Sequence, residues 1–599
     1  MTVYNPPIRE MQFLLHDTLQ ISNYSNLPGF ADATSDLVDA ILEEGGKLAS
    51  NVLHPINQSG DKEGCVRHED GSVTTPKGFK QAYDQFSEGG WQGLSFDANY
   101  GGQGLPYLLS VVFNEMVSSA NMAFGMYPGL SMGAAQAILA HGTEEQKQLY
   151  LPKMVTGEWG GTMNLTEPHC GTDLGLLRTK AVKNDDGTYK VSGTKIFISA
   201  GEHDLTENII HLVLARIEGA PDGVKGISLF IVPKNNVNED GSVGGPNGVS
   251  CGSIEEKMGI HANSTCVMNY DDATGYLVGE ENKGLKAMFV MMNEARLGVG
   301  IQGLAISEVA YQNGAAYAVD RLQGRALAGP KYPDKPADPI IVHPDIRRML
   351  MDHRAFNEGA RAWMYWTALQ ADLHHKSEDE ATSQKADDYM GLMTPILKAY
   401  LTDKGYAHAT NAQQILGGHG YIQEWGMEQF VRDARIAMIY EGANGIQALD
   451  LVGRKLMKDG GRAWQTFFKE IDEFIADNQE TEELKPYLDG LADAKKDVEE
   501  ATQWLAANAM QNFDNAGAGS TDYLYMFALL CLTHGWAQMA KAAIEKKSAG
   551  DSSEFLNAKM ITGKYFLERL LPDVKSHLAK VKTGSETMMS MPESAFLAS

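Results

Sequence analysis

The sequence is poor in cysteine, and its few cysteines follow no recognisable pattern. There are five in 599 residues, an odd number, and their spacing matches neither a CxxC pair nor a Cys/His zinc motif. A disulfide framework and a metal site are therefore not expected. Reduced thiols are typical of a cytosolic protein, so we predict a cytoplasmic location.

Positive charge and long apolar runs are also scarce. Lys and Arg number 51 against 77 Asp and Glu, and the resulting net charge of −26 argues against a nucleic-acid partner and against an anionic membrane surface. The N-terminus MTVYNPPIREMQFLLHD has no basic segment followed by an apolar run, so no signal peptide is expected. The apolar run from Tyr523 to Leu532 is shorter than the ~20 residues that span a bilayer and indicates a buried helix.

A change of periodicity divides the chain. Helical spacing dominates from Ala31 to His141, whereas segments after Glu158, such as KGISLFIVPK, are apolar and β-branched. Asp186-Gly187 predicts a hairpin between two of these strands. Helical spacing returns at Gly284. At one domain per ~150 residues, the length suggests about four domains.

Glu441 is the candidate catalytic residue. The segment QFVRDARIAMIYEGANGIQ places this carboxylate between two helical patterns, and Gly417 and Gly418 are suited to end a helix upstream. A carboxylate at an apolar junction between helices is partly desolvated, which raises its pKa toward the range of a general base. The simpler interpretation is an acidic residue at a helix N-terminus, where it interacts with the helix dipole.

Several motifs in this order resemble the acyl-CoA dehydrogenase family. They include TEPHCGTD, KIFISAG, NEARLGVG, GGHGY, RDAR and IYEG, and the resemblance covers about Ala31 to Leu456. It implies that Glu441 removes the α-proton of an acyl-CoA thioester while a β-hydride passes to FAD, which leaves a trans-2-enoyl-CoA. It also implies that Arg296 lies close to this base and that Gly442 contacts the substrate.

The resemblance further implies two sets of FAD contacts. The contacts expected within one chain come from Leu165, Thr166, Thr172, Phe197 and Ser199. Phe197 and Thr172 stand where the family more often has tryptophan and serine, and both keep the chemistry. The contacts expected to serve the FAD of a neighbouring chain come from Arg321, Gln414 and Gly418. A homodimer is therefore expected, with an electron-transfer flavoprotein as the electron acceptor.

The acyl chain is the least determined part of the prediction. By analogy Asn121, Met122 and Phe124 border the acyl pocket, although simple core packing explains them equally well. The length of the chain resembles a C-terminally extended subgroup that includes 3-methylmercaptopropionyl-CoA dehydrogenases. Membership would imply oxidation of 3-methylmercaptopropionyl-CoA to methylthioacryloyl-CoA in dimethylsulfoniopropionate breakdown. The alternatives are a general short- or medium-chain acyl-CoA dehydrogenase, an acyl-CoA oxidase, and a flavin-containing binding or scaffold protein.

The predicted fold is mainly α with a β-domain. It comprises an N-terminal extension (1–35), an N-terminal helical domain (36–157), a middle β-barrel-like domain (158–280), a helical catalytic domain (281–457) and an added C-terminal helical domain (458–599). The GLSMG segment at Gly129 to Gly133 is predicted to be helical, so it is not a nucleophile elbow. In the added domain, helices are expected around Trp464 to Ile475, Val498 to Phe513, Tyr523 to Ala543 and Phe555 to Val574.

Overall fold

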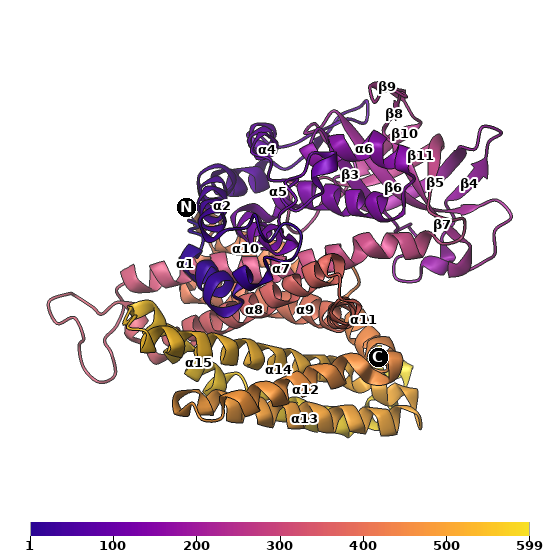
Figure 1. Ribbon diagram of the computed structural model, residues 1–599. Helices are drawn as coiled ribbons and strands as arrows, with labels where there is room; N and C mark the ends of the chain where they lie inside the picture. The colour runs from indigo at the N-terminus through magenta and orange to yellow at the C-terminus, as the bar shows by residue number, and fades with distance from the viewer. Residues whose placement is uncertain (1, 598–599) are drawn as a thin grey trace. The chain divides into compact units, whose positions relative to one another are not determined.

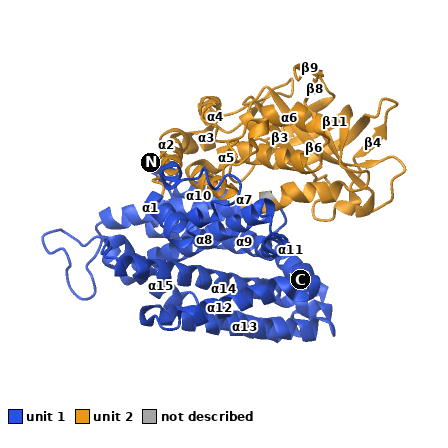
Figure 2. Ribbon diagram, in the orientation of Figure 1, with its two compact units in different colours: residues 1–3, 7–39, 299–599 blue, residues 4–6, 40–298 orange. Residues whose placement is uncertain are grey.

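The computed structural model describes residues 2–597 and divides into two compact units (Figures 1 and 2). Unit 1 comprises residues 1–3, 7–39 and 299–599, and unit 2 comprises residues 4–6 and 40–298. The helices α2 (Ser35–Leu48) and α7 (Gly284–Asp320) contribute residues to both units. The fold is mainly helical with one sheet domain, as the sequence predicts.

Five strands of unit 2 close into a barrel. The strands of its sheet are β3 (Trp159–Asn164), β4 (Lys180–Lys183), β5 (Tyr189–Ser199), β6 (Asn208–Ile217), β7 (Ile227–Pro233), β10 (Val249–Ile254) and β11 (Thr265–Val278). β11 pairs with β5, β5 with β4, β4 with β6, β6 with β7, and β7 with β11 again. β10 lies beside β11, and β3 pairs with β6 in parallel. This closed order confirms the predicted barrel-like domain, and the predicted hairpin joins β4 to β5.

The barrel is covered on its outer side as well as filled on its inner side. The sequences of β6 and β7, NIIHLVLARI and ISLFIVP, are nearly continuous apolar runs, as expected for strands with both faces buried. Leu212 and Leu214 of β6 join an apolar cluster with residues of the helices α5 (Tyr107–His141) and α6 (Glu144–Thr156), whereas Val213 joins the cluster on the other face. A register slip by one residue would exchange these faces, so the packing fixes the register.

The long helix α5 of unit 2 is interrupted at Asn121. This residue has φ −159° and ψ 90°, and its Oδ1 accepts a hydrogen bond from the Phe124 N–H at 3.1 Å. Asn121 therefore caps the second half of the helix. GLSMG lies in that half, so its predicted helical state is confirmed.

The helices of unit 2 and its short strand pairs are η3 (Ala49–Leu53), η4 (His54–Ile56), α3 (Asn57–Glu63), β1 (Val66–Arg67), β2 (Val73–Thr74), α4 (Phe79–Glu88), η5 (Ala98–Tyr100), α5 (Tyr107–His141), α6 (Glu144–Thr156), η6 (Leu174–Leu176), η7 (Val224–Gly226), β8 (Asn235–Val237) and β9 (Val243–Pro246).

Unit 1 is a stack of long helices, in which α14 packs against α8 on one side and against α13 on the other (Figure 1). Its helices before the C-terminal extension are α1 (Ile8–Gln12), η1 (Phe13–Thr18), η2 (Ile21–Tyr24), η8 (Ile340–Val342), α8 (Pro344–Lys376), α9 (Glu380–Ile415), η9 (Gly417–Tyr421), η10 (Gln423–Trp425), α10 (Met427–Ala437), α11 (Asn444–Asp450), η11 (Leu451–Lys455) and η12 (Lys458–Gly461). Those of the extension are α12 (Arg462–Asn478), η13 (Glu482–Leu484), α13 (Lys485–Ala509), α14 (Phe513–Ser548), α15 (Glu554–Arg569), α16 (Asp573–Thr583), α17 (Glu586–Met589) and η14 (Glu593–Phe596). None of the described helices combines the length and the apolarity needed to cross a lipid bilayer.

The helices of the extension differ from the predicted ones in their bounds. The helix expected from Val498 to Phe513 is the second half of α13, and Phe513 begins α14 instead of ending its predecessor. The prediction failed because the charged residues between the apolar positions of α13 hide its period. The extension is docked tightly, because Trp536 of α14 donates from Nε1 to the Ala355 carbonyl at 3.1 Å. A Cβ at Gly359 would lie 2.7 Å from the same nitrogen, so this approach requires glycine.

A buried ion network joins the two ends of unit 1. Lys559 of α15 is fully buried, and its Nζ lies 2.5 Å from Glu10 Oε1 and 2.6 Å from Glu358 Oε2. Glu10 belongs to α1 and Glu358 to α8, so one ammonium group ties the first helix of the chain to the bundle and to the extension. Burial raises the pKa of the Glu10 carboxyl.

A proline-rich loop between α7 and α8 projects from the bundle at the left of Figure 1. The loop is ordered around Asp338, a fully buried carboxylate that accepts hydrogen bonds from the N–H groups of Ala326, Lys331 and Tyr332. Pro344 begins α8, so the loop ends at His343.

Candidate active site

The two segments predicted to bind flavin within one chain lie side by side in unit 2. The Ile196 N–H of β5 donates to the Thr166 carbonyl at 2.9 Å, which fixes the loop after β3 against the end of β5. This contact brings Leu165 and Thr166 to the strand that carries Phe197 and Ser199. Thr172 lies further along the same loop and is exposed.

Phe197 is the conspicuous residue of this region. Its side chain is 60% exposed, and its φ of 60° lies in the left-handed region that residues with a side chain seldom adopt. The hydroxyl groups of Thr166, Thr172 and Ser199 form no hydrogen bond with any other described residue. An exposed aromatic face beside hydroxyl groups that have no partner among the described residues suits a flat heteroaromatic ligand with polar edges.

A buried ion pair holds the loop in this position. Lys195 of β5 is fully buried, and its Nζ donates to Glu167 Oε1 at 2.9 Å and to the Leu165 carbonyl at 3.0 Å. Glu167 also accepts hydrogen bonds from the Thr179 N–H at 3.0 Å and from the Arg178 N–H at 2.8 Å. The pair therefore fixes both ends of the loop that carries Thr166 and Thr172.

The protonation of this pair follows from its surroundings. Burial lowers the pKa of the Lys195 ammonium to about 8, and the Glu167 charge opposes that effect. Burial alone would raise the pKa of Glu167, but the Lys195 charge and the hydrogen bonds from Thr179 and Arg178 lower it instead. Glu167 is therefore a carboxylate whose charge is compensated inside the protein.

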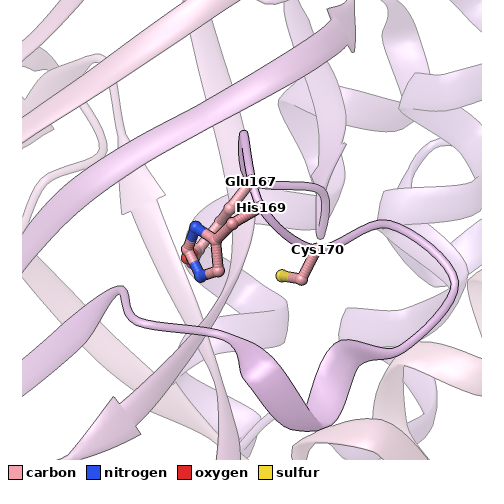
Figure 3. Close-up of side chains that lie close together, drawn as sticks. All are labelled: Glu167, His169 and Cys170. Carbon is pink, nitrogen blue, oxygen red and sulfur yellow. The ribbon is translucent and has the colours of Figure 1, made fainter.

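Glu167, His169 and Cys170 form a cluster of the kind that can bind a metal ion (Figure 3). One potential ligand atom from each residue lies within 4.8 Å of the others. However, the Lys195 ammonium already compensates the Glu167 charge, and burial raises the pKa of the Cys170 thiol, which keeps it protonated. A divalent cation would have to displace the ammonium, so we interpret this cluster as an anchor of the loop.

Glu441 lies in the short connection between α10 and α11 of unit 1. It is half-buried, and its φ of 56° is left-handed, as is the φ of 86° at Gly442. Such a backbone costs about 1–2 kcal/mol for a residue other than glycine, so the surroundings must stabilise it. The predicted end of the upstream helix is confirmed, because α9 ends at Ile415 and Gly417 follows with a φ of 58°.

Side chains from two helices hold the carbonyl groups of the Glu441 connection. Lys398 of α9 is fully buried and donates from Nζ to the Gly442 carbonyl at 2.8 Å. Gln447 of α11 donates from Nε2 to the same carbonyl at 3.1 Å and to the Glu441 carbonyl at 3.2 Å. The hydroxyl of Tyr440 donates to Gln302 of α7. Every residue from 440 to 442 is therefore tied to a helix of unit 1.

Arg321, Gln414 and Gly418, the residues predicted to serve a neighbouring chain, lie in unit 1 and are exposed. The Tyr317 hydroxyl lies 2.8 Å from His419 Nδ1, which ties the end of α7 to η9, the element that contains Gly418. The Arg321 side chain forms no ion pair or hydrogen bond with any other described residue.

The predicted substrate residues in α5 are buried. Asn121, Met122 and Phe124 are at most 2% exposed, and the Phe124 ring packs against Phe79 and Phe86 at centroid distances of 5.9 and 5.8 Å. Within unit 2 these side chains therefore contribute to the core. The predicted partner of the base, Arg296, is half-buried in α7, and its proximity to Glu441 stays a prediction.

Models of four protein domains match the sequence. They are the N-terminal domain of acyl-CoA dehydrogenase at residues 46–158, its middle domain at 162–273, its C-terminal domain at 282–457, and the acetyl-CoA dehydrogenase C-terminal-like domain at 467–592. The chain belongs to the acyl-CoA dehydrogenase family. The enzyme class predicted from the motifs, a flavin-dependent oxidoreductase of this family, is thereby confirmed.

Individual acyl-CoA dehydrogenases are similar to this chain, two of them along nearly its whole length. The 3-methylmercaptopropionyl-CoA dehydrogenase of Ruegeria pomeroyi is 42% identical over 98% of this chain and 99% of its own. The broad-specificity linear acyl-CoA dehydrogenase of Mycobacterium tuberculosis is 34% identical over the full length of both. The structure of butyryl-CoA dehydrogenase from Megasphaera elsdenii is 28% identical and covers 70% of this chain and 97% of its own, with a TM-score of 0.57.

Sequence reasoning missed the residues that position the acyl-CoA dehydrogenase motifs. Glu167 and Lys195 stand inside the two flavin motifs, and the alternation of β5 places Lys195 in phase with the buried Tyr189 and Val191. A lysine at an inward position signals a buried partner, so this pair could have been found. The role of Lys398 had no comparable local signal.

Proposed function

We propose that this acyl-CoA dehydrogenase oxidises 3-methylmercaptopropionyl-CoA to methylthioacryloyl-CoA, a step of dimethylsulfoniopropionate breakdown. The observation that supports this substrate is the 42% identity to a relative of that name along nearly the whole of both chains, extension included. A broader specificity for short and medium straight chains is the second candidate, favoured by the 34% identity to a relative described as broad in specificity.

We infer that the cofactor is FAD and that it is bound by Leu165, Thr166, Thr172, Phe197 and Ser199. The exposed Phe197 ring and the three hydroxyl groups without partners in the described part of the chain fit this cofactor, because the ring can stack on an isoalloxazine and the hydroxyls can donate to its polar atoms. When bound, FAD would accept a hydride from the β-carbon of the thioester.

The proposed base is Glu441, which takes the α-proton on its carboxylate. Its left-handed backbone, with hydrogen bonds on the carbonyl groups of residues 441 and 442, supports this role, because strain of that kind persists at sites where a side chain must be aimed. The Glu441 N–H would donate to the thioester carbonyl, where negative charge develops as the proton leaves. Gly442 offers no side chain that would obstruct the thioester, and Arg296 is proposed to lie near the base.

We further propose a homodimer in which Arg321, Gln414 and Gly418 complete the FAD site of the partner. Support comes from the exposed position of all three and from the absence of a partner for Arg321 among the described residues. An electron-transfer flavoprotein is the proposed acceptor, as expected for a dehydrogenase rather than an oxidase. The five free thiols agree with a cytoplasmic location.

Anaerobic reduction of the flavin by a panel of acyl-CoA thioesters tests the proposed substrate. We expect 3-methylmercaptopropionyl-CoA to bleach the flavin faster than butyryl-CoA, hexanoyl-CoA and octanoyl-CoA at equal concentrations. A rank among the slowest members of the panel would refute the substrate and leave the broad specificity. Stoichiometric hydrogen peroxide under aerobic turnover would identify an oxidase.

A further inference from the structure

We propose that the C-terminal extension is part of the catalytic apparatus, because Tyr525 of α14 positions the Glu441 connection through a chain of hydrogen bonds. This inference rests on the proposed role of Glu441 as the base. Tyr525, Asp403, Asn444 and Lys398 would be positioning residues, since none of them is proposed to touch the reacting atoms.

The chain of hydrogen bonds has four links. The Tyr525 hydroxyl donates to Asp403 Oδ2 at 2.6 Å, and Asp403 Oδ1 accepts from Asn444 Nδ2 at 2.7 Å. Asn444 Oδ1 accepts from Lys398 Nζ at 2.8 Å, and the same ammonium donates to the Gly442 carbonyl at 2.8 Å. The path therefore runs from the extension to the carbonyl group of Gly442, the residue that follows Glu441.

The Tyr525 end of this path is held by further contacts. The Tyr525 ring lies edge to face with Tyr400 of α9 at 5.2 Å and with His577 of α16 at 5.3 Å between ring centroids. Burial and the Asp403 charge raise the pKa of Tyr525, so its hydroxyl keeps its proton and always donates. A hydrogen bond from a neutral phenol to a carboxylate is of the stronger, charge-assisted kind.

The Glu441 connection needs such support. Two successive residues, Glu441 and Gly442, have left-handed backbones, and Ala443 at the N-cap of α11 has no side-chain acceptor for the helix N-terminus. Asn444 is therefore the first residue after the base whose side chain can anchor the backbone. It does so against α9, where it donates to Thr402 Oγ1 at 2.9 Å as well as to Asp403.

Asp403 is the point at which the extension acts. Its two carboxylate oxygens accept from different partners, Tyr525 on one side and Asn444 on the other. Loss of the Tyr525 hydroxyl would leave Oδ2 free to turn toward another donor, and Oδ1 would move with it. A displacement of the base by about 1 Å is enough to lower a rate by about 10²-fold, so a small rotation is sufficient to affect catalysis.

Tyr525→Phe and Tyr523→Phe are the matched test. Both residues lie on α14 and each loses one hydroxyl, but the Tyr523 hydroxyl lies 2.7 Å from Thr502 Oγ1, inside the extension. The holoenzymes are compared by stopped-flow flavin reduction at saturating acyl-CoA, by the perturbation of the flavin spectrum on binding enoyl-CoA product, and by thermal unfolding. We expect Tyr525→Phe to lower the reduction rate about 3- to 10-fold with product binding unchanged, and Tyr523→Phe to lower only the unfolding temperature.

Lys398→Met extends the test to the last link, and we expect a loss of about 10- to 100-fold in the reduction rate, partly restored by Lys398→Arg. Equal reduction rates for Tyr525→Phe and Tyr523→Phe would overturn the positioning inference. Glu441→Gln, measured in the same series, separates the two failures. If that variant is inactive while the two tyrosine variants agree, only the positioning role is lost, whereas a fully active Glu441→Gln would remove the proposed base itself.

Discussion

Two buried lysines hold two candidate functional segments of this protein in different ways. Lys195 and Lys398 are both fully buried, both donate to backbone carbonyls, and each lies near a residue with a left-handed backbone, Phe197 or Glu441. Lys195 pairs directly with the Glu167 carboxylate, which lies in the preceding motif. Lys398 instead reaches Asp403 through the Asn444 amide, and the path continues into the extension.

The difference separates a local device from a distributed one. Glu167 and Lys195 are 28 positions apart. They belong to the segments TEPHCGTD and KIFISAG, so one domain contains the whole arrangement. The Tyr525 and Asp403 pair spans 122 positions and joins the extension to the bundle. Breaking the first should act on folding and on the proposed FAD site, whereas breaking the second should act on the orientation of the base.

Glu441→Gln is expected to have the largest effect on the reaction. Glutamine keeps the size of the side chain but does not accept the α-proton, and removal of a general base costs about 10²- to 10⁴-fold in rate. Anaerobic stopped-flow reduction at matched FAD content measures this loss. Glu424→Gln is the control, because Glu424 lies nearby in sequence and is exposed. Near wild-type reduction by Glu441→Gln would show that the base lies elsewhere.

Lys195→Met is expected to have the next largest effect, and on stability. It leaves Glu167 charged and buried without its partner, which costs about 3–5 kcal/mol in the free energy of unfolding. The urea concentration at the midpoint of unfolding and the ratio of flavin to protein absorbance would both fall. The double variant Lys195→Met/Glu167→Gln should recover part of the loss, because no lone charge remains.

Lys183→Met is the matched control for Lys195→Met. Lys183 lies on β4 of the same barrel and pairs with Glu281 at 3.4 Å, but both side chains are about half exposed. Removal of such a pair costs at most about 1 kcal/mol. If Lys195→Met destabilised the protein no more than Lys183→Met, the ion pair would not be what holds the loop that carries Thr166 and Thr172.

Arg321→Ala should have the smallest effect on the isolated chain, and it sharpens the comparison by probing a cation with no ion-pair or hydrogen-bond partner among residues 2–597. We expect the unfolding free energy to change by less than about 0.5 kcal/mol, because the side chain forms no ion pair or hydrogen bond with another described residue. FAD retention should fall about tenfold if the guanidinium binds a cofactor phosphate of the partner, since a charge-assisted pair contributes about 1.5–3 kcal/mol. Equilibrium dialysis against free FAD measures this, and a fully flavinated monomer in gel filtration would contradict the shared site.

Much of the fold was predictable because its signals are local. Alternation and the Asp186-Gly187 turn signal sufficed for β4 and β5, and the glycines after Ile415 were sufficient to end α9. The interruption of α5 at Asn121 was missed, because an asparagine in an apolar run reads as a pocket residue unless its capping of Phe124 is visible. The predicted helices of the extension are too short where charged residues stand between the apolar positions of an amphipathic helix, as in α13.

The sequence names candidate reacting groups but not the side chains that support them. Motif resemblance names Glu441 and Phe197, but it is silent on Lys398, Asp403 and Tyr525. Side chains that act through others leave no spacing rule in the sequence, because their partners are selected by packing between helices that are far apart in the chain. Three-dimensional coordinates are needed to recognise such a path.

The ion network at Lys559 has a consequence for how the protein is made. Glu10 leaves the ribosome 549 residues before Lys559. At a synthesis rate of about 5–20 residues per second, its carboxylate waits roughly 30–110 s for its partner. During that interval the neighbouring Phe13, which is buried in the finished protein, lacks the Phe555 ring of α15, which it packs against at 5.5 Å between centroids. Helix α1 is therefore synthesised early but completes its contacts late, and the apolar surface beside it lacks its α15 partner for most of that interval.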